Sequence, residues 1–427
     1  MLTVKYIENN RDFVVSRLKI KRFDAEEIVN EIICIENKRK VVQIQLETLL
    51  AEQNRIAREA GERIGVLKKE GKDIEQVKQE AGEASAKFKI QSTELEGEAS
   101  LLEKQIYDKL VQLPNLPHET VPSGKGAEDN IIVKEGGVIP QLSSKLPHWE
   151  LAAKYDIIDF EAGNKLTGAG FPVYKGKGAK LQRALIAMFL DHNIENGYLE
   201  IQPPVMVNED SAFATGNLPD KEGQMYHATA DNFYLIPTAE VPVTNLYRNV
   251  IVPENELPIK LTAYSLCFRR EAGSYGKDVR GLNRLHQFDK VEIVQIIQPE
   301  KSYEALEKMV ANVESLIKKL ELPYRILRLC GGDMSFTSAL TYDFEVYSTA
   351  QERWLEVSSV SNFESFQANR LKLRYKNQQK KTEILHTLNG SALALPRIVA
   401  ALLENCQTEK GIILPKTLAN YAGFDSI

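Results

Sequence analysis

The chain has 427 residues, 43% of them hydrophobic and 26% charged, and its formal net charge is −5. This length exceeds one ordinary hydrophobic core, and the absence of any apolar run of about 18 residues excludes a membrane-spanning helix. The net acidity excludes a protein covered in basic surface, although a local basic face could still contact RNA. The N-terminal segment lacks a basic-then-apolar signal pattern, and the four cysteines form no CxxC pair or zinc spacing, so we expect a reduced, cytoplasmic protein.

Two stretches near the N-terminus carry apolar residues at alternating three- and four-residue steps, which is heptad spacing. The first consists of Ile28, Ile32, Ile35, Val42, Leu46, Leu49 and Ile56, and the second of Ile74, Val77, Ala81, Ala84, Phe88, Leu95, Ala99, Leu102 and Ile106. A short segment that contains Gly71, residues 68–73, separates them. Two apolar stripes joined by a short turn predict an antiparallel helical hairpin, and helices of ~40 residues predict an arm of roughly 60 Å.

The helical pattern ends at Pro114 and Pro117, because proline cannot continue a helix. A connector rich in glycine, proline and serine follows at residues 121–130. Beyond it, the predicted elements include a helix at residues 181–190 and strands at residues 288–296 and 342–347. Helices and strands do not alternate regularly, so we expect an α+β fold with a mostly antiparallel sheet flanked by helices.

Charge is distributed unequally over the two predicted helices. Residues 38–69 carry eight Lys/Arg and four Asp/Glu, whereas residues 73–104 carry four Lys and eight Asp/Glu. One interpretation is that opposite charges on two solvated faces help the helices to pair. The other is that the first helix presents a basic stripe to a phosphate backbone. That stripe comprises Lys38, Arg39, Lys40, Arg55, Arg58, Arg63, Lys68 and Lys69.

The sequence contains no GxxxxGK[ST], GxGxxG, HExxH or GxSxG pattern, so a nucleotide site here would use arginines and a metal in place of a P-loop. The strongest candidate is the segment 267–294, which reads as a strand, a long loop and a strand. Guanidinium groups bind pairs of phosphate oxygens, and an aromatic ring such as Phe288 could stack on a base. The alternative is a mobile, basic surface hairpin. The polar and glycine residues of this loop are Arg269, Arg270, Gly273, Gly276, Lys277, Arg280, Gly281, Arg284 and His286.

Two further patterns could complete such a site. Glu356 and Ser359 flank a strand end, and a carboxylate with a hydroxyl forms half of a Mg²⁺ shell. A strand at residues 391–395 runs into a helix that begins near Pro396, which places Arg397 at a positive helix terminus suited to phosphate. The structural alternatives are surface polar residues and a core helix with an exposed arginine.

A fourth pattern lies in the segment 234–247. A strand is expected to end at residues 237–240, and alternate residues of a strand share one face. Thr238 and Glu240 could then hold an ammonium group and a hydroxyl together. The alternative is an ordinary polar strand exit.

In this order the segments resemble the three motifs of class II aminoacyl-tRNA synthetases. ENGYLEIQPPVMV at residues 195–207 is similar to motif 1, FRRE followed by HQFDKVE to motif 2, and residues 390–404 to motif 3. The phrases PTAE, FRREAGSYGKDVRGLNRLHQFDKVE, DMSFTSALTYDFEVY, EVSSVSNF, HTLNGS and LPNLPHETVP, with the hairpin, are similar to the seryl-tRNA synthetase family over nearly the whole chain. The resemblance implies a tRNA-binding coiled-coil arm at residues 1–115 and an antiparallel class II catalytic domain at residues 116–427.

The resemblance also implies an activity and its partners. The protein would activate L-serine with ATP and Mg²⁺ to seryl-adenylate, and transfer serine to tRNA(Ser) and to tRNA(Sec) as a second candidate. It would be a homodimer, because motif 1, with Pro204, forms the dimer interface in this class. The implied serine-binding residues are Thr238, Ala239, Glu240, Glu292 and Ser391. The implied ATP-binding residues are Arg269, Arg270, Glu271, Arg284, Leu285, Phe288, Glu356, Val357, Ser358, Ser359 and Arg397.

Individual roles follow from the same resemblance. The implied catalytic residues are Arg269 at the α-phosphate and serine carboxylate, Glu271 at the adenine amino group, and Arg397, with Arg284, at the distal phosphates. Phe288 would stack on adenine and Leu285 would contact ATP through its main chain. Glu292 would hold the serine ammonium or hydroxyl group, and Glu356 and Ser359 would carry the metal. On the arm, the expected tRNA contacts are Arg55, Arg58 and Arg63.

Three positions depart from the family pattern. Ala392 and Pro396 stand where motif 3 usually carries glycines, and Leu340 where many relatives carry lysine. The Ala392 methyl group is expected close to the adenine. A non-catalytic paralogue would have lost the ATP arginines or the metal carboxylate, and an amino acid:carrier-protein ligase of this fold would lack the long arm, so both are less consistent with the sequence.

Overall fold

The structure is a computed structural model, and it describes residues 1–142, 145–220, 223–271 and 280–427. The chain forms two compact units. One comprises residues 2–19 and 23–114, and the other comprises residues 115–427 with Met1 and residues 20–22. Three candidates of the segment 267–294, Gly273, Gly276 and Lys277, lie outside the described residues.

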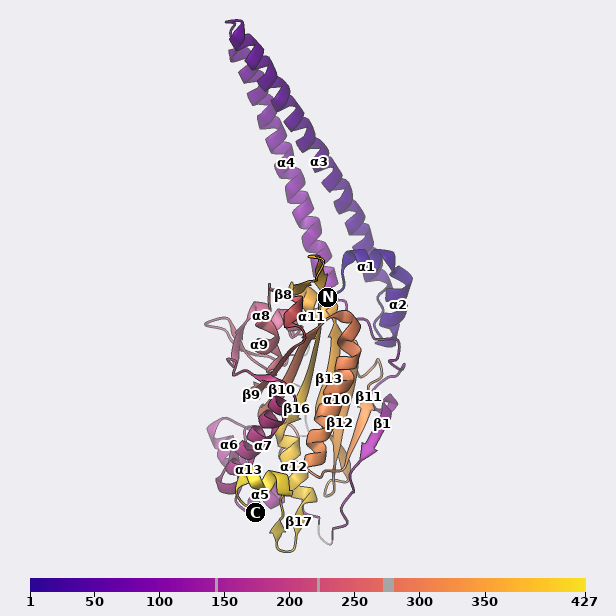
Figure 1. Ribbon diagram of the computed structural model, residues 1–427, viewed down its shortest axis with the longest axis vertical. Coiled ribbons are helices and arrows are strands. Elements are labelled where there is room, and N and C mark those ends of the chain that lie inside the picture. The colour runs from indigo at the N-terminus through magenta and orange to yellow at the C-terminus, as the bar shows by residue number, and fades with distance from the viewer. Residues whose placement is uncertain (143–144, 221–222, 272–279) are drawn as a thin grey trace. The chain divides into compact units, whose positions relative to one another are not determined.

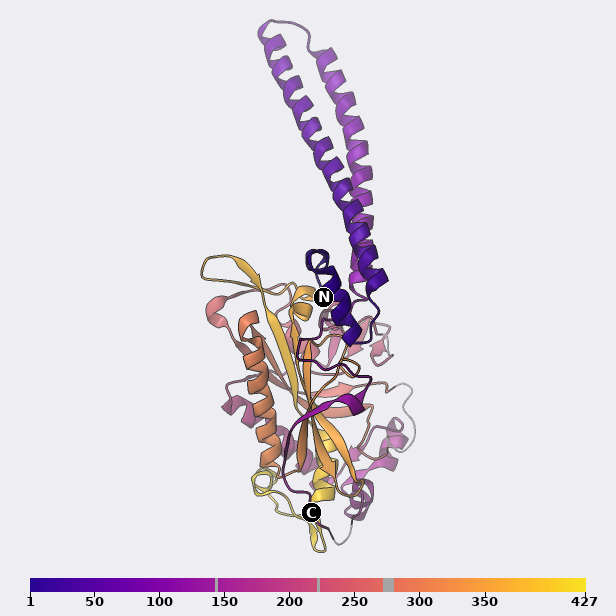
Figure 2. The same cartoon turned by 90° about the vertical axis from the view of Figure 1, so that its right-hand side faces the viewer.

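The first unit is helical. Its helices are α1 (Val4–Asn9), α2 (Arg11–Ile20), α3 (Glu26–Lys69) and α4 (Glu75–Leu110). The long helices α3 and α4 lie side by side and confirm the predicted hairpin (Figure 2). Every apolar residue of the two predicted stripes is buried or partly buried. Gly71, in the turn between them, has a φ of +66°, which glycine adopts without a steric penalty.

The second unit is built on an eight-stranded sheet, which confirms the predicted α+β class. Its strands follow the order β1 (Ile131–Gly136), β11 (Tyr324–Arg328), β12 (Leu340–Ser348), β13 (Arg353–Glu364), β16 (His386–Ala394), β10 (Gln287–Ile297), β9 (Ile259–Phe268) and β4 (Leu199–Glu200). Neighbours are antiparallel except β4 and β9, which are parallel. The strands predicted at residues 288–296 and 342–347 are β10 and β12.

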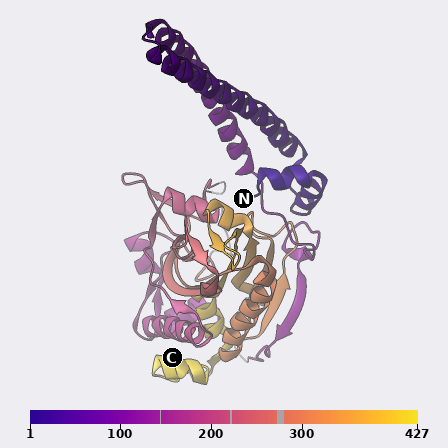
Figure 3. The same ribbon diagram turned by 45° about the horizontal axis from the view of Figure 1, so that its top comes forward.

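Three helices cover one face of this sheet (Figures 1 and 3). They are α7 (Gly176–Glu195), which contains the predicted helix, α10 (Ser302–Lys319) and α12 (Leu395–Asn405). Val291 and Ile293 of β10 belong to the core beneath them, whereas Val294 and Ile296 belong to a second core on the opposite face. Alternate strand residues share a face, so β10 directs its even-numbered residues to the second face.

Shorter elements complete the second unit. They are α5 (His148–Lys154), β2 (Ile158–Asp159), α6 (Phe160–Leu166), β3 (Val173–Tyr174), β5 (Met206–Asn208), α8 (Glu209–Thr215), β6 (Tyr226–Ala228), β7 (Phe233–Leu235), α9 (Glu240–Asn245), β8 (Ile251–Pro253), α11 (Ser365–Arg370), β14 (Arg374–Lys376), β15 (Thr382–Ile384), β17 (Gln407–Thr408), β18 (Gly411–Ile412) and α13 (Lys416–Ala422), with 3₁₀ turns at Ala127–Asp129, Glu254–Glu256 and Pro299–Lys301. Within the described part of the chain, no helix is both long and apolar enough to cross a membrane.

Candidate active site

Four polar side chains gather on the second face of β10. Glu292 is 1% exposed, and its carboxylate accepts hydrogen bonds from Thr238 Oγ1 at 2.9 Å and Asn389 Nδ2 at 2.8 Å. The Lys290 ammonium group lies 2.5 Å from Glu292 Oε2 and donates to Thr238 Oγ1 at 2.9 Å. Buried charges are costly unless they are paired and hydrogen-bonded, so Lys290 and Glu292 are stable here only together.

Thr238 and Glu292 were predicted for this group, whereas Lys290 and Asn389 were missed. Lys290 precedes Glu292 by two residues in a predicted strand, so strand alternation was a usable signal for it. Asn389 lies opposite Val294 in the pairing of β16 with β10. That proximity depends on the register of two strands almost a hundred residues apart, which no local pattern contains.

Thr238 and Glu240 do not follow the predicted strand. β7 stops at Leu235 and α9 begins at Glu240, so the expectation that strand alternation aligns them is wrong. The first N–H groups of a helix need acceptors, and Thr238 Oγ1 accepts the Glu240 N–H at 3.2 Å. The Glu240 carboxylate accepts a hydrogen bond from Gln367 Nε2 at 2.6 Å, and burial, with a nearby carboxylate, raises the pKa of Glu240 to about 7.

Glu356 and Ser359 lie within β13 and not at its end. Residues three apart in a regular strand point to opposite faces. The pairing of β13 with β12, however, skips Val357, which opposes no residue of β12. This bulge returns both side chains to one face, and Ser359 Oγ lies 3.5 Å from Glu356 Oε1.

Asp343 of β12 joins this pair. It lies directly opposite Ser359 and accepts a hydrogen bond from its Oγ at 2.5 Å. Burial and the Glu356 carboxylate raise the pKa of Asp343 well above its ordinary value. A divalent cation with oxygen ligands would favour the ionised form of both carboxylates, so these residues fit such an ion. Asp343 was not predicted, although carboxylates at alternate positions of a predicted strand, 343 and 345, were a usable signal.

A metal at this place would need ligands beyond the protein's own. Among the described residues, no group of three or more His, Cys, Asp and Glu side chains could hold a metal ion. Two carboxylates and a hydroxyl supply part of an oxygen shell, and substrate oxygens or water would supply the rest.

Arg397 lies in the first turn of α12, and Pro396 occupies the start of that helix, as predicted. The guanidinium donates from Nε to the Asn283 carbonyl at 3.0 Å and from Nη1 to the Glu356 carbonyl at 2.7 Å. Its side chain is 32% exposed. The arginine is therefore anchored on one side and open to an anion on the other.

The segment 267–294 places its cations next to a carboxylate and a ring. Arg284 forms an ion pair with Glu271. The Arg269 guanidinium lies 5.3 Å from the centre of the Phe288 ring, which is cation–π geometry. Leu285 is buried, at 5% exposure, and belongs to the core beneath the three helices.

Ser391 lies opposite Glu292 in the pairing of β16 with β10, which brings it to the same buried group. The Ser391 carbonyl accepts a hydrogen bond from Ser358 Oγ at 2.5 Å. Ser358 and Val357 are 2% exposed, and Ala239 is fully buried. These three residues therefore expose almost no surface to a ligand.

Comparisons with known proteins find relatives that match the whole chain. Residues 1–117 match the family model described as "Seryl-tRNA synthetase N-terminal domain", and residues 225–406 match "tRNA synthetase class II core domain (G, H, P, S and T)". The chain is 47% identical to a serine–tRNA ligase of Salinibacter ruber, over 100% of this chain and 99% of that protein. It is 44% identical to a serine–tRNA ligase of Leptospira biflexa, over 99% and 100% of the two chains.

This chain belongs to the seryl-tRNA synthetase family. Among solved structures, the seryl-tRNA synthetase of Pyrococcus horikoshii complexed with ATP is similar with a TM-score of 0.91 and 32% identity, over 100% of this chain and 99% of that one. The cytoplasmic serine–tRNA ligase of Naegleria fowleri in complex with AMP is similar with a TM-score of 0.87 and 26% identity, over 100% and 98%. The protein is thus a class II aminoacyl-tRNA synthetase, a ligase that forms an aminoacyl-tRNA ester.

The three departures from the family pattern are tolerated for different reasons. Ala392 and Leu340 are buried in the core beneath the three helices, at 0% and 3% exposure. Both side chains pack in this apolar core, and the expected closeness of the Ala392 methyl group to the adenine stays a prediction. Pro396 fits its position because the first turn of a helix does not need its missing N–H.

The expected tRNA contacts on the synthetase arm are exposed and already engaged. Arg55 contacts Glu52 at 2.5 Å and Glu59 at 2.8 Å, and its side chain is 55% exposed. Arg63, 67% exposed, lies 3.8 Å from Glu80 of the other helix, which favours the helix-pairing interpretation for this residue. Arg58 is the most exposed of the three at 78%, and its contact with Glu62, at 3.6 Å, is longer.

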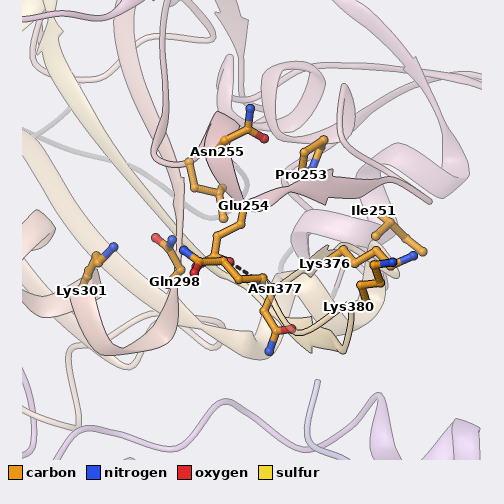
Figure 4. A pocket seen from close by; sticks show the side chains of 11 residues that line it. Ile251, Pro253, Glu254, Asn255, Gln298, Lys301, Lys376, Asn377 and Lys380 are labelled. Atoms are coloured by element: carbon orange, nitrogen blue, oxygen red, sulfur yellow. Dashed lines mark hydrogen bonds between the residues drawn. The ribbon is translucent and has the colours of Figure 1, made fainter.

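A separate pocket of about 570 Å³ lies beside the small sheet of β8, β14 and β15 (Figure 4). It is lined by Ile251, Pro253, Glu254, Asn255, Leu257, Gln298, Lys301, Lys376, Asn377, Gln378 and Lys380. None of these is a predicted serine- or ATP-binding residue, so this pocket is not the active site described above.

Proposed function

We propose that this synthetase activates L-serine with ATP to seryl-adenylate and transfers the seryl group to tRNA(Ser), and also to tRNA(Sec). The observation that carries the proposal is full-length similarity to serine–tRNA ligases, combined with a buried polar group suited to a small hydroxyl-bearing amino acid. In this proposal serine occupies the site formed by Thr238, Ala239, Glu240, Glu292 and Ser391.

The serine site discriminates by hydrogen bonding. Glu292 holds three donors, and a carboxylate has about four lone-pair sites, so one acceptor position is left for the substrate. The hydroxyl group of serine can satisfy it, whereas the ammonium group, which every amino acid carries, would give no selectivity there. An amino acid with a methyl group there, such as alanine, would leave buried polar groups without a partner, which binding penalises strongly.

ATP is proposed to bind along the exposed arginines, consistent with the ATP complex of the Pyrococcus horikoshii relative. Phe288 stacks on the adenine ring, the Glu271 carboxylate accepts a hydrogen bond from the adenine amino group, and Leu285 contacts ATP through its main chain. Arg284 and Arg397 bind the distal phosphates, for which Arg284 must exchange Glu271 for phosphate. The remaining proposed contacts come from Arg269, Arg270, Glu356, Val357, Ser358 and Ser359.

Mg²⁺ is proposed to bind at Glu356 and Ser359, with Asp343 behind them, where it would neutralise phosphate charge. Arg269 orients the serine carboxylate toward the α-phosphorus, and the carboxylate oxygen attacks as pyrophosphate leaves. Positioned cations stabilise the charge that develops on the phosphate oxygens. In the second step the terminal ribose hydroxyl of tRNA attacks the seryl carbonyl, forms the ester and releases AMP.

Two assemblies belong to the proposal. Arg55, Arg58 and Arg63 contact the tRNA backbone. Residues 1–115 serve as a tRNA-binding domain, and residues 116–427 serve as the catalytic domain.

A homodimer forms through the segment 195–207, where Pro204 is exposed and Leu199, at the edge of the sheet, is 64% exposed. Such an interface would be isologous. Light scattering that showed an active monomer of 48.1 kDa at micromolar concentration would contradict the dimer.

The decisive test is ATP–pyrophosphate exchange with each of the twenty amino acids, followed by charging of tRNA(Ser) and tRNA(Sec) transcripts. We expect exchange with serine alone. Exchange with another amino acid would contradict the substrate, and exchange without charging would contradict the transfer step.

A further inference from the structure

A fully buried histidine lies beneath the ATP side of the catalytic unit. His148 is the first residue of α5, which packs against α12 (Figure 1). Both its side chain and that of Glu404, near the end of α12, are 0% exposed. His148 Nδ1 lies 2.7 Å from Glu404 Oε1, and the His148 backbone N–H donates to the same oxygen at 3.0 Å.

The other ring nitrogen contacts the segment that enters β10. His148 Nε2 accepts the backbone N–H of Leu282 at 2.8 Å. An N–H donor requires a bare nitrogen, so the ring must be neutral, with its proton on Nδ1 donated to Glu404. The Glu404 carboxylate also accepts a hydrogen bond from Ser348 Oγ, so the acceptor of the ring proton is held in place by a second donor.

The contact with this segment is too close for any residue but glycine at position 281. A Cβ placed on Gly281 would lie 2.2 Å from His148 Nε2, and the φ of Gly281 is +66°. The backbone of residues 281–282 thus rests directly on the imidazole edge. Arg280, one residue earlier, lies 4.7 Å from the centre of the Trp149 ring next to His148.

A second connection joins the same segment to α12. Gln351 Nε2 donates to Glu404 Oε1 at 3.0 Å, and Asn283 Nδ2 donates to Gln351 Oε1 at 2.9 Å. The Asn283 carbonyl in turn accepts from Arg397 Nε at 3.0 Å. Arg397 and Glu404 are seven residues apart, two helical turns, so α12 holds residues 282–283 from both of its ends.

We propose that His148 is a positioning residue for ATP: by linking Glu404 to the Leu282 N–H, it fixes the segment that carries Arg284 and Leu285 relative to Arg397. This inference rests on the proposed function, in which those three residues bind ATP. Cations that stabilise phosphate charge must be in place before the reaction. A small displacement of Arg284 or Arg397 would therefore weaken ATP binding and the stabilisation of that charge. His148 itself touches no substrate.

Two isosteric substitutions separate the two hydrogen bonds of the ring. In His148→Asn the amide nitrogen of the side chain takes the place of Nδ1 and can still donate to Glu404. The shorter side chain cannot reach the Leu282 N–H. The amide of His148→Gln takes the place of Nε2 and can accept the Leu282 N–H. Each variant is measured by serine-dependent pyrophosphate exchange for kcat and for the KM of ATP and of serine, with the melting temperature alongside.

We expect His148→Asn to raise the KM of ATP about tenfold, the size expected when a buried N–H loses its acceptor, with the KM of serine changed less than about twofold. His148→Gln should restore most of the ATP affinity, whatever its melting temperature. His386→Asn is the matched control, because His386 bonds Ser302 at 2.8 Å at the far end of β16, and it should leave both KM values unchanged.

Two outcomes would overturn the inference. One is a KM of ATP in His148→Asn within about twofold of the wild type, and the other is an equal rise in both KM values, which indicates general loosening. If His148→Asn does not fold, Gln351→Met breaks the second connection from a partly exposed position and should raise the KM of ATP selectively. Absence of serine-dependent exchange in the wild type would instead contradict the proposed function.

Discussion

The two ends of the active site hold their charges differently. At the proposed serine end, Lys290 and Glu292 are 5% and 1% exposed and satisfy each other through short contacts. At the proposed ATP end, Arg284 and Arg397 are 41% and 32% exposed. Phosphate can replace the Glu271 carboxylate at Arg284, whereas Arg397 is also held by the main-chain carbonyls of Asn283 and Glu356. The proposed serine end is therefore organised before substrate arrives, whereas Arg284 at the proposed ATP end would change its partner around the ligand.

The sharpest test of the preorganised end is Lys290→Met. It leaves the Glu292 carboxylate buried without its cation, which costs about 3–5 kcal/mol of folding free energy for comparable pairs. Denaturant unfolding should show this loss. The double variant Lys290→Met, Glu292→Gln should recover stability but not serine-dependent exchange. A single variant as stable as the wild type would mean that the pair is not coupled.

At the ATP end, Arg269→Ala should lower pyrophosphate exchange by orders of magnitude with little effect on stability. The arginine is exposed, and its proposed contact strengthens in the transition state, for which losses of about 10²–10³-fold are typical. The rate of pyrophosphate exchange and the melting temperature are measured on the same variant. Exchange at near wild-type rate would show that the α-phosphate is held by another residue.

Asp343→Asn examines the carboxylate pair next to the ATP end. Loss of a carboxylate behind metal ligands typically weakens metal binding by about tenfold or more, so more Mg²⁺ should be needed for half-maximal exchange. Glu307→Gln is the control, because Glu307 lies on α10, accepts a hydrogen bond from Tyr342 at 3.0 Å and does not belong to this carboxylate group. Equal Mg²⁺ requirements in both variants would remove Asp343 from the metal site.

The arm extends the comparison to tRNA. Replacing Arg55, Arg58 and Arg63 with Ala should weaken tRNA binding and lower the salt dependence of log K by roughly two to three, while exchange stays intact. Arg58→Ala alone should account for the largest share, since that side chain is the most exposed. If the charges only help the helices to pair, thermal stability falls and tRNA affinity does not change.

The smallest expected effect concerns Glu240, whose pKa is raised from 4.5 to about 7 by burial and by Glu292. A raised carboxyl pKa means that the folded protein favours the protonated form, so this contribution to stability is lost as the pH rises toward and through 7. The melting temperature of Glu240→Gln minus that of the wild type should therefore increase from pH 5 to pH 8. A constant difference would indicate that Glu240 stays ionised throughout.

The sequence by itself determined the elements of this protein that depend on residues close together in the chain. Heptad spacing places the hairpin and its buried stripes, period-two alternation places β10 and β12, and Pro396 marks the start of α12. The irregular order of helices and strands indicated the α+β class, and the similarity of the motifs to the seryl-tRNA synthetase family added the class II core and the activity.

Tertiary structure decided how the site residues meet. The bulge at Val357 turns Glu356 and Ser359 to one face, a turn and not a strand aligns Thr238 with Glu240, and Asn389 reaches Glu292 only through strand register. The link from His148 to Leu282 spans 134 positions of the chain. Such contacts depend on irregular backbone and long-range pairing, whose energies belong to the packed fold and not to any window of sequence.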